Sequence, residues 1–177
     1  MSRVAYVNGT YRPHGQAVVH IEDRGFQFAV GVYEVWGVFE GGLADFDGHM
    51  TRLKRSLTEL KIDIPMSDAA LSRVLAETIR RNRVRNGLVY LQVTRGTAPR
   101  DHAFPRDVAP SVVVTAKSVD PSRNEALAKK GAAAVSQPDL RWGRCDIKTV
   151  SLLPNVLAKQ AARESGAYEC LMYDEMG

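Results

Sequence analysis

The segment DIKTVSLLPNVLAKQ, residues 146–160, places Lys148 just ahead of an apolar run that opens a helix. A Schiff base forms on a primary amine that partial burial has made nucleophilic, and among side chains only lysine carries such an amine. A lysine at the foot of a helix is more often a solvated surface charge, and its spacing alone favours that interpretation. The choice between the two interpretations therefore depends on the surrounding residues.

A longer pattern surrounds Lys148. The run RWGRCDIK, residues 141–148, followed by LLPNVLAKQ, residues 152–160, resembles the cofactor-lysine segment of the class IV pyridoxal-phosphate aminotransferases, and in particular of the D-amino-acid aminotransferases in that family. The resemblance extends from Tyr6 to Glu175 through separate segments in the family's order. It implies that Lys148 forms a Schiff base with pyridoxal 5'-phosphate and moves a proton between substrate and cofactor as general base and acid.

An early strand segment extends the resemblance. RGFQF, residues 24–28, and GVYEV, residues 31–35, match the family's pattern, whose tyrosine corresponds to Tyr33 and borders the substrate-carboxylate pocket. Without the resemblance, Tyr33 would be interpreted as a half-buried strand aromatic. The chain departs from the family at Val30, where aspartate is common, and this changes the expected local hydrogen bonding but not the assignment of Tyr33.

A His-x-x-Arg-Leu pattern follows in HMTRL, residues 49–53. In the family its arginine binds the cofactor phosphate, so the resemblance implies that role for Arg52, whose guanidinium fork matches phosphate oxygens. Taken alone, Arg52 is equally well explained as a surface arginine of a helix. His49 is expected only to cap that helix or to fill the core.

The loop RGTAPRDHAFP, residues 95–105, is the most discriminating motif of the chain. It resembles the loop with which D-amino-acid aminotransferases hold the substrate α-carboxylate, and it implies that role for Arg100 and His102. A fixed cationic fork can orient a carboxylate and so decide which face of the substrate Cα meets the lysine. In the family this loop reaches into the neighbouring subunit, which predicts a homodimer. By itself, the pattern would indicate only an exposed loop with an idle arginine and histidine.

The composition is that of an ordinary globular protein. The 177 residues are 45% hydrophobic and 25% charged, enough for one full core or for one domain and part of another. The formal charge of +4 is spread along the chain except in residues 80–85, RRNRVR, which we expect at a solvated helix end rather than in a nucleic-acid site. Only two cysteines occur, so we expect a reducing compartment and no disulfide framework, and because they lack metal-ligand spacing we expect no metal. Without a membrane-length apolar run or a signal-peptide core, a cytoplasmic protein is expected.

Runs of β-branched and alternating residues predict the strands. Asn8-Gly9 suits the type I′ turn of an N-terminal hairpin, and Gly41-Gly42 suits the turn of another. The expected strands are Val4–Val7, Thr10–Arg12, Ala17–Ile21, Val32–Phe39, Leu43–Phe46, Leu88–Thr94, Ser111–Ser118 and Tyr168–Tyr173.

Apolar residues at three- and four-residue spacing predict the helices. Two of these helices begin at side chains that can cap a helix, and the third is closed by a glycine that suits a left-handed cap. The expected helices run from a cap at Asp47 to before Pro65, from Ser67 to near Gly87, and over residues 155–164 to Gly166.

The expected fold is α+β, of the class IV aminotransferase type. An antiparallel sheet with two helices would form a small N-terminal domain over residues 1–120, and residues 121–177 would form a link and the start of a larger, β-rich cofactor-binding domain. Residues 174–177 resemble a turn that should lead into a partner strand for Tyr168–Tyr173. Complete proteins usually cover such a strand edge, because an unpaired edge promotes aggregation. We therefore expect a truncated chain.

The resemblance implies transamination of D-amino acids such as D-alanine, with a 2-oxo acid such as 2-oxoglutarate as acceptor. In the family, the glutamate that pairs with the cofactor's pyridine nitrogen lies beyond the position of Gly177, so the isolated chain is expected to bind cofactor poorly and its own activity is not assured. A branched-chain aminotransferase or an aminodeoxychorismate lyase is the alternative within the fold, and the Arg100 and His102 loop argues against both. A non-catalytic dimerising scaffold is the alternative from another class.

Overall fold

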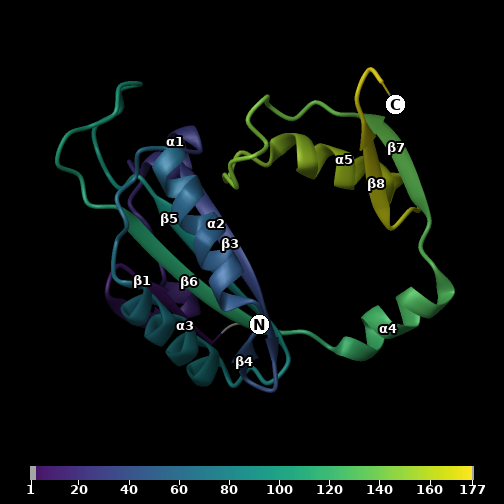
Figure 1. Cartoon of the computed structure of the whole chain (residues 1–177), viewed down its shortest axis with the longest axis horizontal. Helices are drawn as coiled ribbons and strands as arrows, with labels where there is room; N and C mark the ends of the chain where they lie inside the picture. Colours follow the sequence, from purple (N-terminus) through teal and green to yellow (C-terminus); the bar gives the residue numbers. More distant parts are fainter. Residues whose placement is uncertain (1–2, 177) are drawn as a thin grey trace. The chain divides into compact units, whose positions relative to one another are not determined.

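The computed structural model describes residues 3–176, which form two compact units (Figure 1). The first unit comprises the residues up to Val119 together with Ile147–Val150, and the second comprises Asp120–Asp146 and the residues from Ser151 onward. Lys148 therefore belongs to the first unit, although the chain on either side of it belongs to the second. That residue 120 is also the boundary between two domains stays a prediction.

Six strands form one antiparallel sheet within residues 3–119. Strands β5 and β3 pair over nearly their full lengths, from Gly31 opposite Thr94 to Val38 opposite Gly87. In spatial order the strands are β2 (Thr10–Pro13), β1 (Val4–Val7), β6 (Ser111–Ser118), β5 (Gly87–Thr94), β3 (Gly31–Phe39) and β4 (Gly42–Leu43). The antiparallel sheet predicted from the sequence is confirmed.

Alternation along β3 decides what each face of the sheet carries. Every second residue from Val32 to Val38 is buried, whereas Tyr33 and Val35 between them are half-buried. Because successive side chains of a strand point to opposite faces, one face of β3 enters the core and the other is more open. Glu34 belongs to the buried series, which is unusual for a carboxylate.

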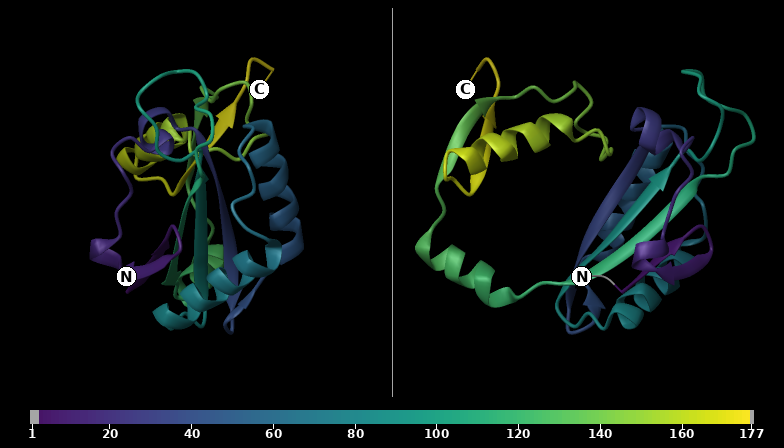
Figure 2. Two further views of the ribbon diagram at one scale, coloured as in Figure 1. Left: turned by 90° about the vertical axis from the view of Figure 1, so that its left-hand side faces the viewer. Right: turned by 180° about the vertical axis from the view of Figure 1, so that it is seen from behind.

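Two helices cover the buried face: α2 (Phe46–Glu59) and α3 (Asp68–Asn82). In the left view of Figure 2 both lie on the same side of the sheet. The Ser67 hydroxyl accepts a hydrogen bond from the backbone amide of Ala70, so the predicted cap of α3 is confirmed. Helix α2 begins one residue before Asp47, which is therefore not the cap; its carboxylate lies in the first turn, where it still favours the helix dipole.

Three other predicted segments differ in the structure. Residues 17–21 form no strand; their apolar side chains are largely exposed, and a strand needs a partner edge that none of the described strands offers them. The strand expected over Leu43–Phe46 ends at Leu43, because Phe46 already begins α2. Helix α3 ends at Asn82, where Arg83 adopts the left-handed conformation (φ 53°), rather than near Gly87.

Two short helices were not predicted from the sequence: η1 (His14–Gln16), a single 3-10 turn, and α1 (Arg24–Phe28). The Asp23 carboxylate accepts from the Gly25 amide and caps α1. A five-residue helix buries too few periodic apolar side chains to give a sequence signal, so only its tertiary contacts could reveal α1.

The second unit begins with a helix where a link was expected. Helix α4 (Pro121–Lys130) is capped by Asp120, whose side chain accepts from the Ser122 amide, and proline at the first turn suits a helix start. Strand β7 (Ala134–Pro138) follows, then α5 (Leu153–Glu164) and β8 (Glu169–Tyr173). Within the described part of this unit, β8 pairs with β7 in parallel along one of its edges. The partner strand expected from the turn after β8 stays a prediction. That turn includes Gly177, which lies outside the described residues.

Candidate functional site

Lys148 is fixed to the edge of β3 by its own backbone. The Tyr33 amide donates to the Lys148 carbonyl at 3.1 Å, and the Val150 amide donates to the Gly31 carbonyl at 3.1 Å. The Lys148 amide donates to the Ser56 hydroxyl of α2 at 3.3 Å. The segment thus forms an antiparallel bridge at Thr149 to Val32, which ties the backbone of the lysine to β3.

The Lys148 side chain points to the more open face of the sheet. Its neighbours Ile147 and Thr149 are buried, and alternation sends Lys148 the other way. There its Nζ lies 4.1 Å from the centroid of the Tyr33 ring, a distance at which an ammonium is attracted to the ring face. The structure therefore brings together two of the residues implied by the sequence.

Tyr33 is itself supported by a second tyrosine. Its ring stacks on Tyr90 of β5 with centroids 5.7 Å apart, and the Tyr90 hydroxyl donates to Gln92 Oε1 at 2.8 Å. Burial, with a smaller contribution from Tyr33, raises the pKa of Tyr90 to about 12. Tyr90 consequently remains a neutral hydrogen-bond donor at any pH at which the protein would work.

Arg52 is held by the buried carboxylate of Glu34. Arg52 Nε and Nη2 donate to the two oxygens of Glu34, each at 2.7 Å, and His49 Nδ1 lies 2.7 Å from Glu34 Oε2. Burial raises the pKa of Glu34, but hydrogen bonds from Arg52 and His49 outweigh it, so the pKa is lowered from its ordinary value. The paired contact orients the guanidinium plane and leaves Nη1 not engaged by Glu34.

His49 has a defined place in this group. Its ring also lies against Trp36, with centroids 5.3 Å apart, and Trp36 is fully buried. The sequence predicted a cap or core role for His49. The cap role is wrong, because the N-cap of α2 is Asp45; the ring packs against a core residue and also has a partner carboxylate.

Arg100 and His102 lie together on the loop between β5 and β6. The guanidinium of Arg100 stands 4.8 Å from the centroid of the Phe28 ring, and the His102 ring lies 5.6 Å from the same ring. Both side chains are exposed. An exposed cation and an imidazole on one aromatic platform can meet a carboxylate that enters from solvent.

The predicted site residues thus fall into three groups within the described part of the first unit: Lys148 with Tyr33, Arg52 with Glu34 and His49, and Arg100 with His102. Tyr33 and Glu34 are adjacent on β3 and face opposite sides of it, so the strand is the common support of the first two groups. Glu34 was not singled out from the sequence; its signal is a carboxylate at an inward position of an alternating strand.

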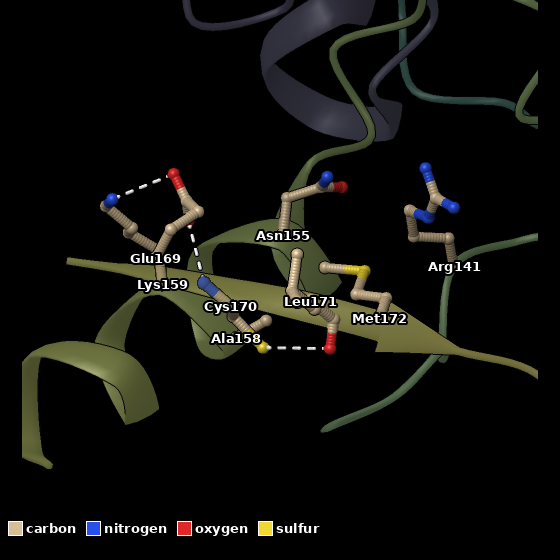
Figure 3. Close-up of a pocket in the computed structure, with 8 residues that line it drawn as sticks. All are labelled: Arg141, Asn155, Ala158, Lys159, Glu169, Cys170, Leu171 and Met172. Atoms are coloured by element: carbon tan, nitrogen blue, oxygen red, sulfur yellow. Dashed lines mark hydrogen bonds and ion pairs between the residues drawn. The ribbon is translucent and has the colours of Figure 1, made fainter. Parts of the chain in front are cut away.

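The second unit contains a hollow of about 530 Å³ (Figure 3). Asn155 and Ala158 line it from α5, and Leu171 and Met172 line it from β8. At its edge Lys159 makes an ion pair with Glu169 at 2.9 Å, and this contact lowers the pKa of Glu169. This lysine is therefore already paired, unlike an amine free for covalent chemistry.

No group of three or more His, Cys, Asp or Glu side chains lies close enough to hold a metal ion among residues 3–176. Over the same described residues, no helix is both long and apolar enough to cross a membrane. The two cysteines, Cys145 and Cys170, are free thiols.

The sequence of the chain matches a known protein family. Residues 31–177 match the family described as amino-transferase class IV, which covers most of the chain and all of the predicted site residues. The chain belongs to the class IV aminotransferase family. The D-alanine aminotransferase of Bacillus licheniformis is 42% identical over 165 residues, and that of Listeria monocytogenes is 39% identical over 168 residues. These alignments cover 93% and 94% of this chain, and the chain spans 58% of the length of each relative.

Solved class IV structures share the fold. The branched-chain amino acid aminotransferase of Escherichia coli superposes with a TM-score of 0.84 at 17% identity, over all of this chain and 61% of the solved one. The branched-chain enzyme of the archaeon Thermoproteus uzoniensis, solved with norvaline, gives a TM-score of 0.80 at 22% identity, again over the whole chain and 61% of the solved one. At such identities the likeness concerns the fold.

Proposed function

We propose that the intact protein is a pyridoxal-phosphate-dependent transaminase of D-amino acids such as D-alanine, with a 2-oxo acid such as 2-oxoglutarate as acceptor. The observation that carries the proposal is Lys148, whose backbone is locked to β3 and whose ammonium lies on the Tyr33 ring. Family membership and relatives named D-alanine aminotransferase support the substrate class.

The residues present fit the cofactor. Arg52 offers a guanidinium that Glu34 orients through Nε and Nη2, with Nη1 remaining for an anion such as a phosphate. Lys148 offers a primary amine on a backbone that is hydrogen-bonded to β3. When bound, pyridoxal phosphate supplies a carbonyl that condenses with amines and a ring that withdraws electrons from the substrate Cα.

The proposed roles follow from what each side chain touches. Lys148 Nζ would serve as the base that accepts the proton from the substrate Cα and as the acid that passes it on to the cofactor. Its contact with the Tyr33 ring keeps Nζ on the open face of the sheet, where a substrate can approach. Arg100 and His102 bind the substrate carboxylate, and Arg52 binds the cofactor phosphate.

The location and assembly are part of the same proposal. We propose a homodimer in the cytoplasm, because the carboxylate loop of the family works across a subunit interface and because the two free thiols suit a reducing compartment. We also propose that residues up to about 120 form a small domain and that the following residues begin the cofactor-binding domain.

The first test is covalent labelling of Lys148. The intact protein is incubated with pyridoxal phosphate, reduced with borohydride and digested, and the peptides are weighed by mass spectrometry. We expect the label on the peptide that contains Lys148, none in Lys148→Ala, and full labelling in Lys159→Ala, whose lysine is paired with Glu169. Label retained elsewhere in Lys148→Ala at wild-type yield would refute the assignment.

A branched-chain aminotransferase is the second candidate, because the solved neighbours of this fold carry that name. The two candidates differ in the handedness of the substrate. Turnover of D-alanine with 2-oxoglutarate, and none of L-leucine, is expected; the reverse preference would favour the second candidate.

A further inference from the structure

Arg24 is a buried cation outside the predicted site. It is the first residue of α1 and only 1% exposed, although the nearby Ile21 and Phe26 are largely exposed. Arginine is almost never fully buried unless it is paired. Within the described residues Arg24 forms no ion pair with a carboxylate, and its buried Nε has no hydrogen-bond partner.

The guanidinium of Arg24 forms hydrogen bonds with the loop that carries Arg100 and His102. Its Nη1 donates to the Asp101 carbonyl at 2.8 Å, and its Nη2 donates to the His102 carbonyl at 3.4 Å. It also lies 4.8 Å from the centroid of Phe28, the ring that Arg100 contacts at the same distance. Arg24 therefore touches the backbone at the loop's tip and shares an aromatic platform with its side chains.

Hydrogen bonds tie the turn that carries Arg24 to the residues at the end of β5. The buried Asp23 carboxylate accepts from both the Gly25 amide and the Thr94 hydroxyl, at 2.8 Å each. The Arg24 amide donates to the Gly96 carbonyl at 2.9 Å. A Cβ on Gly25 would lie 2.3 Å from Thr94 Cγ2, so the turn is packed directly on the end of β5.

Stability alone does not account for an arginine here. Burying a charge without a counter-ion is unfavourable, and apolar residues of similar volume commonly replace buried charges without loss of stability. A guanidinium can donate hydrogen bonds to two successive carbonyls at once, here those of Asp101 and His102, and an apolar side chain cannot. A loop that reaches from residue 95 to residue 110 has many conformations, and this fork selects one of them.

We infer that Arg24 is a positioning residue for carboxylate recognition: it fixes the backbone at Asp101 and His102 so that Arg100 and His102 meet the substrate carboxylate in one geometry. The inference rests on the proposed function, because the carboxylate role of the loop is part of that proposal. Arg24 itself is buried and does not touch the substrate.

The test combines loop mobility with kinetics in the intact protein. We would prepare Arg24→Met, Arg24→Lys and, as a matched control, Arg81→Lys. The guanidinium of Arg81 also lies on an aromatic ring, that of Tyr11, and its ion pair is with Glu77 rather than with the loop. Hydrogen–deuterium exchange is followed in peptides that cover residues 98–104. Steady-state rates are measured with D-alanine and 2-oxoglutarate.

Loss of both charge-assisted bonds in Arg24→Met should speed exchange of the loop amides by about ten- to a hundredfold. KM for both substrates should rise by about the same factor, because the lost alignment weakens carboxylate binding. Arg24→Lys, which can keep one bond, should fall between Arg24→Met and the wild type, and Arg81→Lys should match the wild type in both readouts.

Each result has a definite meaning. Unchanged exchange in Arg24→Met, or faster exchange with unchanged KM for both substrates, overturns the inference. If the wild-type protein shows no transamination, the proposed function fails instead, and with it the carboxylate role of Arg24. If Arg24→Met does not fold, Arg24→Lys decides the question by the same two measurements.

Discussion

Replacing Glu34 by glutamine removes the charge at the centre of the Arg52 group while nearly preserving its shape. Glu34 is 0% exposed and accepts from Arg52 twice and from His49 once. An amide can accept at only one of its two ends, so Arg52 Nε or Nη2 would face an NH₂ group. The variant therefore leaves a guanidinium facing a donor in a buried position.

The size of the effect follows from the exposure of the two partners. Breaking a fully buried pair costs about 3–5 kcal/mol. The Arg52 side chain is 47% exposed, so water screens part of the loss, and we expect about 2 kcal/mol. For a chain of this size that corresponds to about 4–8 °C in the melting temperature.

The effect should depend on pH in one direction. Because the pKa of Glu34 is lowered in the folded protein, the unfolded chain takes up the proton first as the pH falls. The stabilisation is complete above the ordinary value of 4.5 and is lost as the pH falls through the lower folded value. Calorimetric melting of the wild type and Glu34→Gln should therefore differ fully at pH 7 and progressively less below 4.5.

Glu77→Gln is the matched control. Glu77 also accepts from two arginines, Arg80 and Arg81, and these hydrogen bonds lower its pKa to about 2. That group lies at the surface, where ion pairs contribute little to stability, so its melting temperature should stay near the wild-type value. If Glu34→Gln melts like the wild type at pH 7, or if the difference persists unchanged in acid, the Arg52 group does not stabilise the fold as described.

Three further predictions concern the site and its support. Arg100→Lys should raise KM for D-alanine and lower turnover by about ten- to a hundredfold, whereas Arg52→Lys should mainly weaken cofactor retention. Titration of both variants with excess pyridoxal phosphate checks this. Rescue of Arg100→Lys but not of Arg52→Lys would show that the two roles are reversed. Gly25→Ala should destabilise the protein by about 1–3 kcal/mol, because its Cβ would overlap Thr94, and urea unfolding measures the loss. The intact protein should sediment as a dimer, and a fully active monomer would contradict the shared carboxylate loop.

Local patterns in the sequence were sufficient where neighbouring residues decide the conformation. Asn8 and Gly9 adopt the positive φ angles of a hairpin turn, and Ser67 caps α3, because each depends on a few adjacent residues. The β-branched runs of β5 and β6 lie at the centre of the sheet, where such side chains pack well. Resemblance to the family pointed to Lys148 as the cofactor lysine, and the motifs on which this resemblance depends can be recognised without a structure.

Tertiary structure alone decided which local tendencies were realised. Residues 17–21 carry a β-rich pattern but have no partner among the described strands, and β8 pairs in parallel with β7 because the intervening α5 returns the chain to the same edge. The sequence does not show whether residues 17–21 will find a strand edge, since that depends on which edges remain available after the chain has collapsed. For β7 and β8 the strand–helix–strand order favours parallel pairing, and the tertiary structure decides that these two strands are the ones that pair.

The same limit applies to the candidate site. Lys148 is rigid because residues 147–150 pair with β3, more than a hundred residues earlier in the chain. Glu34 and Arg24 were missed because a charged side chain in a sequence is expected in solvent, and only the fold supplied the hydrogen-bond partners that hold them in buried positions. The identities of the reactive groups are thus local properties of the sequence, whereas their orientation depends on long-range hydrogen bonds that form only when the sheet, its helices and the loop between β5 and β6 come together.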